Sequence, residues 1–367
     1  MGRLHDLYEQ HRQSPWLDNL SRSAIADGTL QRWLDRGIRG VTSNPSIFQK
    51  AMTSGAAYDE QLATLVRQGA STEDAFWTMA ADDIAAACAL LRPLFDGSGG
   101  DDGFVSLEVA PSLARDESGT TKAALDIHER LGEPNLMVKI PATAEGVPSI
   151  RDVIAAGRNV NVTLIFSLDR YRAVMDAYIA GLEQLAASGG DVSSVRSVGS
   201  FFISRVDSEI DKRLDAIGSP EALALKGRAA VAQGQLAYAL FLETFSGPRW
   251  EALAARGAVV QRPLWASTST KDPAYPDTLY VDTLIGPDTV NTMPEVTIEA
   301  FDDHGTVART VDASLDAARA TWQALADVGV DLDDVAVVLE EQGVASFVKA
   351  FDDLLASLDE KATAFRA

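Results

Sequence analysis

Short apolar runs alternate with longer amphipathic stretches along most of the chain. Apolar runs bounded by turn-forming residues are typical of buried strands, whereas apolar residues three or four positions apart indicate helices. We predict strands over residues 16–20, 40–44, 104–110, 136–142, 159–166, 197–203, 259–267 and 279–284. We predict helices over residues 24–36, 58–68, 73–95, 121–131, 149–156, 168–187, 206–217, 221–245 and 250–256. Such alternation indicates a parallel sheet covered by helices, and eight units predict an α/β fold, the closed (β/α)8 TIM barrel.

The length of the chain, 367 residues, fits two ordinary domains or one large barrel. The alternation favours one barrel domain over residues 1–367, with extra helices at the N-terminus (about 1–14) and the C-terminus (about 314–367). We expect a loop rich in Thr and Pro after residue 284. The helices expected in the C-terminal part cover residues 314–328, 334–341 and 344–361.

Composition limits the partners of the protein. Hydrophobic residues make up 46% and charged residues 23%, as in globular proteins with an ample core. The formal net charge of −21 argues against nucleic acid and anionic membranes as partners, so an anionic substrate would need local cations. The single cysteine, Cys88, excludes an intrachain disulfide. Together with the lack of an evident signal peptide or membrane-spanning run, it favours a cytoplasmic protein.

One lysine, Lys139, lies inside the apolar run 136–142. Lysine is seldom fully buried, and loss of solvation disfavours its ammonium form. A buried lysine would therefore be partly neutral near pH 7 and could attack a carbonyl group. Taken alone, the run fits better with a lysine that reaches the solvent at the end of a sheet. The neighbouring strands change this interpretation.

Polar residues recur on one face of the predicted strands. Strand side chains alternate between faces, and in a barrel the functional groups point inward near the C-terminal ends of the strands. The predicted inward set is Asp18, Thr42, Asn44, Glu108, Met137, Lys139, Asn161, Thr163, Ser200 and Phe202, with Arg205 just beyond a strand end. Isolated buried charges are costly, so their convergence from different strands indicates a site. One amine, two carboxylates and several neutral hydrogen-bonding groups are the inventory of Schiff-base chemistry.

Metal chemistry has little support in the sequence. The histidines lie in predicted helices or loops and lack the paired spacing of a zinc site. Asp18 and Glu108 alone could hold magnesium, but the lysine offers a simpler account. We therefore expect no metal ion and no cofactor.

Five short motifs stand out along the chain: Thr42-Ser43-Asn44-Pro45-Ser46, Ser106-Leu107-Glu108-Val109-Ala110, Val138-Lys139-Ile140-Pro141-Ala142-Thr143, Asn161-Val162-Thr163-Leu164-Ile165-Phe166-Ser167 and Asn291-Thr292-Met293-Pro294. Together they resemble the motifs of the transaldolase family, in the order in which they occur there, and the resemblance extends from about residue 18 to residue 297. The resemblance implies a (β/α)8 barrel whose lysine forms a Schiff base with a ketose phosphate (sedoheptulose 7-phosphate or fructose 6-phosphate). A three-carbon dihydroxyacetone unit would then pass to glyceraldehyde 3-phosphate or erythrose 4-phosphate, in the non-oxidative pentose phosphate pathway. A monomer and a homodimer both remain open.

The resemblance also implies roles for single residues. Lys139 corresponds to the Schiff-base lysine, and Asp18 to the acid/base group for carbon–carbon cleavage. The other implied roles are a catalytic water for Glu108 and Thr163, dihydroxyacetone hydroxyls for Asn44 and Asn161, and substrate binding for Ser200, Phe202 and Arg205, with Arg205 on phosphate.

The chain departs from the family after the seventh strand. Many members carry Ser-x-Arg there for phosphate, and this chain has Ala266-Ser267-Thr268-Ser269-Thr270-Lys271. Ser267 fits this pattern, and Lys271 is the candidate substitute for the arginine, as a point charge without its bidentate fork. Three alternatives stay open: an aldolase of the same barrel type that releases dihydroxyacetone, a metal-dependent barrel isomerase or hydrolase, and a non-catalytic sugar-phosphate-binding barrel.

Overall fold

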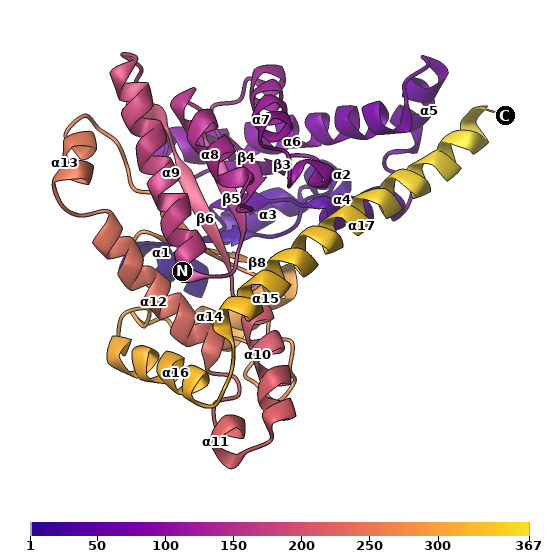
Figure 1. Ribbon diagram of the computed structural model, residues 1–367. Helices are drawn as coiled ribbons and strands as arrows, with labels where there is room; N and C mark the ends of the chain where they lie inside the picture. Colours follow the sequence, from indigo (N-terminus) through magenta and orange to yellow (C-terminus); the bar gives the residue numbers. More distant parts are fainter. Residues whose placement is uncertain (1, 367) are drawn as a thin grey trace.

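The computed structural model describes residues 2–366, and its centre is a closed barrel of eight strands in sequence order (Figure 1). Every neighbouring pair of strands is parallel. The predicted (β/α)8 TIM barrel is therefore confirmed. The strands are β1 (Gln13–Leu17), β2 (Gly40–Thr42), β3 (Phe104–Glu108), β4 (Leu136–Pro141), β5 (Val160–Ile165), β6 (Ser197–Phe202), β7 (Arg262–Ala266) and β8 (Thr289–Met293).

Helices surround the barrel and extend the chain beyond it. They are α1 (Arg3–His11), α2 (Arg22–Ala26), α3 (Thr29–Asp35), α4 (Pro45–Thr53), α5 (Asp59–Arg67), α6 (Thr72–Gly97), α7 (Glu117–Leu131), α8 (Gly146–Ala155), α9 (Leu168–Ala187), α10 (Ser204–Ile217), α11 (Pro220–Leu223), α12 (Ala229–Thr244), α13 (Pro248–Ala254), α14 (Leu279–Asp282), α15 (Glu295–His304), α16 (Leu315–Asp327) and α17 (Leu332–Arg366), with the short 3-10 helices η1 (Pro111–Leu113) and η2 (Val192–Ser194). None of the helices over residues 2–366 is both long and apolar enough to cross a membrane.

The register of the central strands brings polar residues to one level of the barrel. Every residue of β3, β4 and β5 is buried. Across the β3–β4 pair Glu108 lies opposite Lys139, and across the β4–β5 pair Lys139 lies opposite Asn161. Because residues at one level of a parallel sheet point to the same face, these three side chains share the lumen. Their apolar neighbours in the strands face the helices.

The predicted eighth strand, residues 279–284, is wrong. That segment forms α14 and the turn after it, and β8 follows in the segment predicted as a loop. Tyr280, Val281 and Leu284 are buried, so the apolar run marked a core segment, which periodicity alone cannot tell from a strand. Strand β8 was not predicted because many of its residues are polar. They can be buried there because neighbouring parts of the barrel form hydrogen bonds with them. Thr289, for example, accepts a hydrogen bond from Gln13 (2.9 Å) and donates one to the carbonyl of Gly286 (2.6 Å).

Other boundaries also differ from the prediction. Strand β1 begins and ends three residues before the predicted strand 16–20, so Asp18 follows its end. Helix α4 was not predicted, and its N-cap is Asn44 followed by Pro45 at the first helical position, a common helix start. The predicted helices 24–36 and 221–245 are each divided in two, and the predicted helices 334–341 and 344–361 form the single helix α17.

Candidate active site

Lys139 points from β4 into the C-terminal end of the barrel and is 5% exposed. Its Nζ donates a hydrogen bond to the carbonyl of Ser43 (3.1 Å) and lies 3.3 Å from Oε2 of Glu108. The amine therefore lies between the ends of β2 and β3, inside the barrel and away from the helices. Alternation along β4 causes this, since Val138 and Ile140 face outward into the core.

Glu108 and Thr163 are buried polar groups with unused hydrogen-bonding capacity. Neither carboxylate oxygen of Glu108 accepts a hydrogen bond from residues 2–366, and the hydroxyl of Thr163 makes none with them either. Burial raises the pKa of Glu108, while the positive charge of Lys139 opposes this shift and the negative charge of Asp18 adds to it. A carboxyl group with a raised pKa exchanges protons closer to neutral pH.

Asp18 follows β1 and lies at the cavity wall beside two threonines. Its backbone N–H donates to the carbonyl of Met293 (2.8 Å), which fixes its position against β8. Thr42 Oγ1 donates to Asp18 Oδ1 (2.7 Å) and also lies 2.7 Å from Thr292 Oγ1. Desolvation raises the pKa of Asp18, and the charge of Lys139, followed by the hydrogen bond from Thr42, opposes the shift.

A cavity of about 280 Å³ opens above Lys139. Its volume is close to the lower end of the range for small-molecule sites, roughly 300–1,000 Å³. The residues that line it are Asp18, Thr42, Asn44, Ser46, Lys139, Thr163, Ser200, Phe202, Arg205, Ala266, Ser267, Ser269, Lys271, Thr292, Pro294 and Phe347. The structure thus brings all but two of the predicted site residues to one cavity.

The two exceptions, Glu108 and Asn161, are buried and do not line the cavity. Glu108 lies 3.3 Å from the amine of Lys139, which does line it. Asn161 is fully buried, where its Nδ2 donates to Ser106 Oγ (3.0 Å) and its Oδ1 accepts from Ser200 Oγ (2.7 Å). Asn161 therefore orients Ser200, which does line the cavity. Asn44 lines it too, and its Oδ1 caps α4 by accepting from the N–H of Ile47 (3.0 Å), so its amide nitrogen remains available.

Two cations lie on the β6–β7 side of the cavity. Arg205 is in the first turn of α10, with its guanidinium 5.3 Å from the ring centroid of Phe202, and Lys271 is exposed in the loop after β7. Neither side chain forms an ion pair with a carboxylate in the described part of the chain. Desolvation lowers the pKa of Arg205, and desolvation followed by the charge of Arg205 lowers that of Lys271. The pair can therefore bind an anion.

Ser267 connects β7 to this loop through an unusual backbone conformation. Its φ is 55°, in the left-handed region that few non-glycine residues adopt. Its hydroxyl lies 2.9 Å from that of Ser204, and its carbonyl accepts a hydrogen bond from the Ser204 N–H (3.1 Å). These contacts hold the start of α10, which carries Arg205, against the end of β7.

Several lining residues were given no role from the sequence. Ser46 and Thr292 lie inside the quoted motifs, and Thr42 was in the predicted inward set. The sequence could therefore have identified these three residues as part of the site. Ser269 lies beside Ser267 in the loop that departs from the family pattern. Phe347 had no local signal, because it comes from a helix beyond the barrel.

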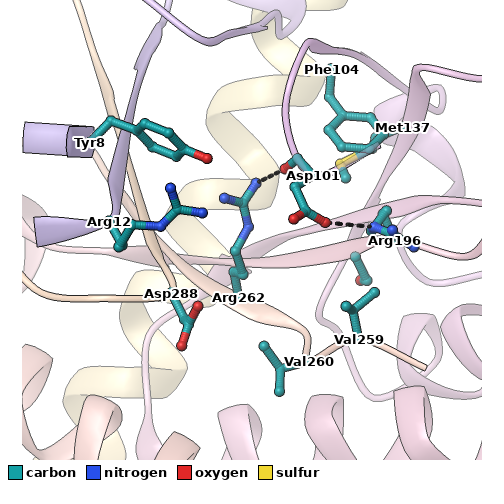
Figure 2. Close-up of a pocket in the computed structure, with 11 residues that line it drawn as sticks. Tyr8, Arg12, Asp101, Phe104, Met137, Arg196, Val259, Val260, Arg262 and Asp288 are labelled. Atoms are coloured by element: carbon teal, nitrogen blue, oxygen red, sulfur yellow. Dashed lines mark hydrogen bonds and ion pairs between the residues drawn. The ribbon is translucent and has the colours of Figure 1, made fainter. Parts of the chain in front are cut away.

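The opposite end of the barrel holds a smaller cavity, of about 80 Å³, with a different character (Figure 2). Figure 2 shows Arg262 reaching the backbone carbonyl of Asp101 (2.7 Å), and Arg196 paired with the Asp101 carboxylate (3.5 Å). Beside them Asp102 is fully buried and pairs with Arg262 (3.2 Å) and Arg39 (2.7 Å). Most of these charges are paired within the protein. The cluster therefore closes the N-terminal end of the barrel and leaves few charges for a ligand.

The fold and the site define a (β/α)8 barrel protein with a buried lysine at the C-terminal ends of its strands. Residues 15–358 match the family model described as Transaldolase/Fructose-6-phosphate aldolase. The chain is 53% identical over 342 residues to the transaldolase of Thermobifida fusca, covering 93% of each chain. It is 52% identical over 366 residues to transaldolase 1 of Streptomyces coelicolor (98% of this chain, 96% of that one) and 50% identical over 351 residues to a transaldolase of Mycobacterium leprae (95% and 94%). The chain belongs to the transaldolase/fructose-6-phosphate aldolase family, which confirms the resemblance found in its motifs.

Proposed function

We propose that the protein is a transaldolase that acts through a Schiff base on Lys139. It would move a dihydroxyacetone unit from sedoheptulose 7-phosphate or fructose 6-phosphate to glyceraldehyde 3-phosphate or erythrose 4-phosphate. The observation that carries the proposal is the placement of one buried amine, 3.3 Å from a buried carboxylate, in a cavity that also contains two cations without carboxylate partners among residues 2–366. The amine suits a ketone, and the cations suit a phosphate.

Imine formation would begin with attack of neutral Lys139 Nζ on the C2 carbonyl of the ketose. The N–C2 bond forms, the amine nitrogen loses one proton, and the carbonyl oxygen takes up two protons in turn before it leaves as water, which gives the protonated imine. Glu108 is the group that we propose to move these protons, because its raised pKa allows both uptake and release closer to neutral pH. The Thr163 hydroxyl, buried and without a hydrogen bond to residues 2–366, would hold the water.

Carbon–carbon cleavage would then use the iminium as an electron sink. Asp18 takes the proton of the C4 hydroxyl, the C3–C4 bond breaks, and its electron pair moves toward the iminium nitrogen. The aldose phosphate leaves, and the three-carbon fragment stays on Lys139 as an enamine. The same steps in reverse, with a second aldose phosphate, complete the transfer.

Binding would divide the substrate between two sides of the cavity. We propose that Arg205, Lys271 and Ser267 hold the phosphate. Asn44 and Ser200 line the cavity and are suited to the dihydroxyacetone hydroxyls. Asn44 follows Ser43, whose carbonyl accepts from Lys139. Ser200 donates to Asn161, which lies opposite Lys139. Direct contact of Asn161 with substrate stays a prediction, and its support of Ser200 gives it an indirect route to the same end. Phe202 would provide an apolar wall beside Arg205.

Borohydride trapping with fructose 6-phosphate, followed by peptide mapping, tests the proposal. The expected result is a three-carbon mass addition at Lys139 that disappears in Lys139→Ala. Carbon exchange without a trapped adduct, or an adduct at another lysine, would contradict it. Activity lost on chelation would favour the metal-dependent alternative, and ketose phosphate binding without carbon exchange would favour a binding protein.

The same substrate, supplied with and without an aldose phosphate acceptor, separates transfer from simple cleavage. A transaldolase turns over rapidly only with the acceptor, whereas an aldolase releases dihydroxyacetone without it. Residues 2–366 contain no group of three His, Cys, Asp or Glu side chains that could hold a metal ion, and independence of metals and cofactors stays a prediction. We further propose that the protein acts in the cytoplasm, in the non-oxidative pentose phosphate pathway. Monomer and homodimer remain alternatives.

A further inference from the structure

Helix α17 crosses the C-terminal end of the barrel as one continuous rod (Figure 1). It contacts α4, η1 and β5, which are the elements that follow or contain Asn44, Glu108 and Thr163. Its residue Phe347 lines the active-site cavity and is 5% exposed. An element outside the eight βα units therefore provides one wall of the site.

Two neighbours of Phe347 on the same face of α17 fix its position. Gly343, Phe347 and Phe351 are four residues apart, a spacing that places them on one side of a helix. A Cβ atom on Gly343 would lie 3.0 Å from the side chain of Leu164, so glycine lets the helix pack closely against the end of β5. Phe351 packs edge-on against Phe76 of α6, with ring centroids 5.2 Å apart. Phe347 lies between these two anchors.

Ion pairs hold the same helix to the barrel from both sides of Phe347. Glu340 is mostly buried and pairs with Arg115 (3.1 Å) and Arg170 (3.4 Å). Near the other end, Lys361 pairs with Asp59 of α5 (2.8 Å). Partly buried pairs of this kind are screened less by salt than exposed ones, and they restrict sliding of the helix.

The wall that Phe347 forms lies on the side of the reactive amine. Gly343 seats the helix on β5, and Phe351 seats it beside α4 and α6, so Phe347 lies over the sector between β2 and β5 that contains Lys139. Arg205 and Lys271 follow β6 and β7, which lie outside this sector in the order of strands around the barrel. The aromatic ring therefore faces the part of the cavity where the three-carbon fragment would be attached.

We propose that Phe347 determines specificity by excluding water from the enamine, which favours transfer over release of dihydroxyacetone. This inference rests on the proposed function. Release requires a solvent proton on C3, addition of water at C2 and cleavage of the C2–N bond, which frees dihydroxyacetone and the Lys139 amine. Each water molecule needs about 30 Å³ of space. Removal of the phenyl ring would create such space next to the intermediate, while the acid/base groups stay in place.

The partition between release and transfer in Phe347→Ala tests the inference. With fructose 6-phosphate as donor, we expect the ratio of acceptor-free dihydroxyacetone release to transfer to rise about tenfold, which corresponds to 1.36 kcal/mol between the two barriers. Phe347→Val should give a smaller rise, and it decides the question if the alanine variant does not fold. Val337→Ala is the control, because Val337 is exposed on the same helix. We expect its ratio of dihydroxyacetone release to transfer to equal that of the wild-type protein.

Borohydride trapping on the same variants separates failure of the inference from failure of the proposed function. An adduct at Lys139 with an unchanged partition ratio in a folded Phe347 variant would overturn the role of Phe347 alone. Absence of any adduct in the unchanged protein would overturn the Schiff-base function, and with it the premise of the inference. A purely structural role predicts a lower melting temperature with equal losses of release and transfer.

Discussion

The lower end of the barrel, at the N-terminal ends of its strands, and the upper end, at their C-terminal ends, each bury a carboxylate beside a cation. The two carboxylates differ in how their negative charge is satisfied. At the lower end Asp102 accepts hydrogen bonds from Ser14 (2.7 Å), Trp16 (3.2 Å), Arg39 (2.7 Å) and Arg262 (3.2 Å). At the upper end Glu108 accepts none from residues 2–366 and has only the amine of Lys139 at ion-pair distance. A fully satisfied charge fixes structure, whereas an unsatisfied one keeps its capacity for protons and ligands.

This contrast follows the general division of labour in (β/α)8 barrels, where the C-terminal ends of the strands carry chemistry and the N-terminal ends carry stability. Here the division is visible in hydrogen bonds between named atoms. Substitutions at the upper end should therefore change activity more than folding, and substitutions at the lower end should do the reverse.

The largest effect is expected for Lys139→Ala at the upper end. Without the amine no imine forms, and transfer should fall by at least about 10⁴-fold, as when other covalent nucleophiles are removed. The measurement is transfer from fructose 6-phosphate to an aldose phosphate, with Lys122→Ala, an exposed lysine on α7, as the control. Turnover retained in Lys139→Ala would show that the mechanism is wrong.

Asp18→Ala should separate the two halves of the reaction. Imine formation does not need the proton acceptor for cleavage, so borohydride should still trap substrate at Lys139. Transfer should fall by about 10³-fold, within the range for loss of a general base. If trapping and transfer declined together, Asp18 would be needed for binding or imine formation and not for cleavage in particular.

At the lower end, Asp102→Asn should affect stability and spare the chemistry. The substitution leaves Arg39 and Arg262 without their buried counter-charge, and breaking a buried ion pair costs roughly 3–5 kcal/mol. Urea denaturation measures this loss, and transfer per folded molecule should be unchanged. A fall in specific activity with unaltered stability would remove the distinction between the two ends.

The smallest effect is a change in how stability depends on pH. The pKa of Glu108 is raised in the folded state, so the folded protein binds more protons than the unfolded chain above the ordinary value of 4.5. The free energy of unfolding should therefore fall as pH rises from 4.5 through the raised pKa. In Glu108→Gln this decrease should be smaller, whereas exposed Glu129→Gln should leave it unaltered. Equal slopes for all three proteins in urea titrations at several pH values would argue against the raised pKa.

Alternation along the strands made most of the site predictable. Glu108, Lys139 and Thr163 stand at positions of the chain where a polar residue interrupts an apolar strand, and such interruptions point into the lumen of a barrel. The closed barrel followed from repeated strand–helix units. Both inferences use local periodicity, which can be seen in the sequence without a structure.

Features that depend on distant packing were not predictable. The apolar run 279–284 has the pattern of a strand, but it forms α14 and a turn. Strand β8 was missed because it contains polar residues, which form hydrogen bonds with neighbouring parts of the barrel. Asn161 was predicted to reach substrate, and its hydrogen bonds to Ser106 and Ser200 became visible only with the structure. The place of Phe347 depends on where α17 crosses the barrel, which no local pattern indicates.

The position of α17 after the last strand has a consequence for how the protein is made. All eight strands precede residue 294, so a ribosome delivers every proposed acid, base and nucleophile before it delivers Phe347. A nascent chain that stops short of α17 would carry the proposed Schiff-base lysine with one side of its cavity still open to the medium. Synthesis from the N-terminus thus produces the proposed catalytic side chains first and the helix that covers them last.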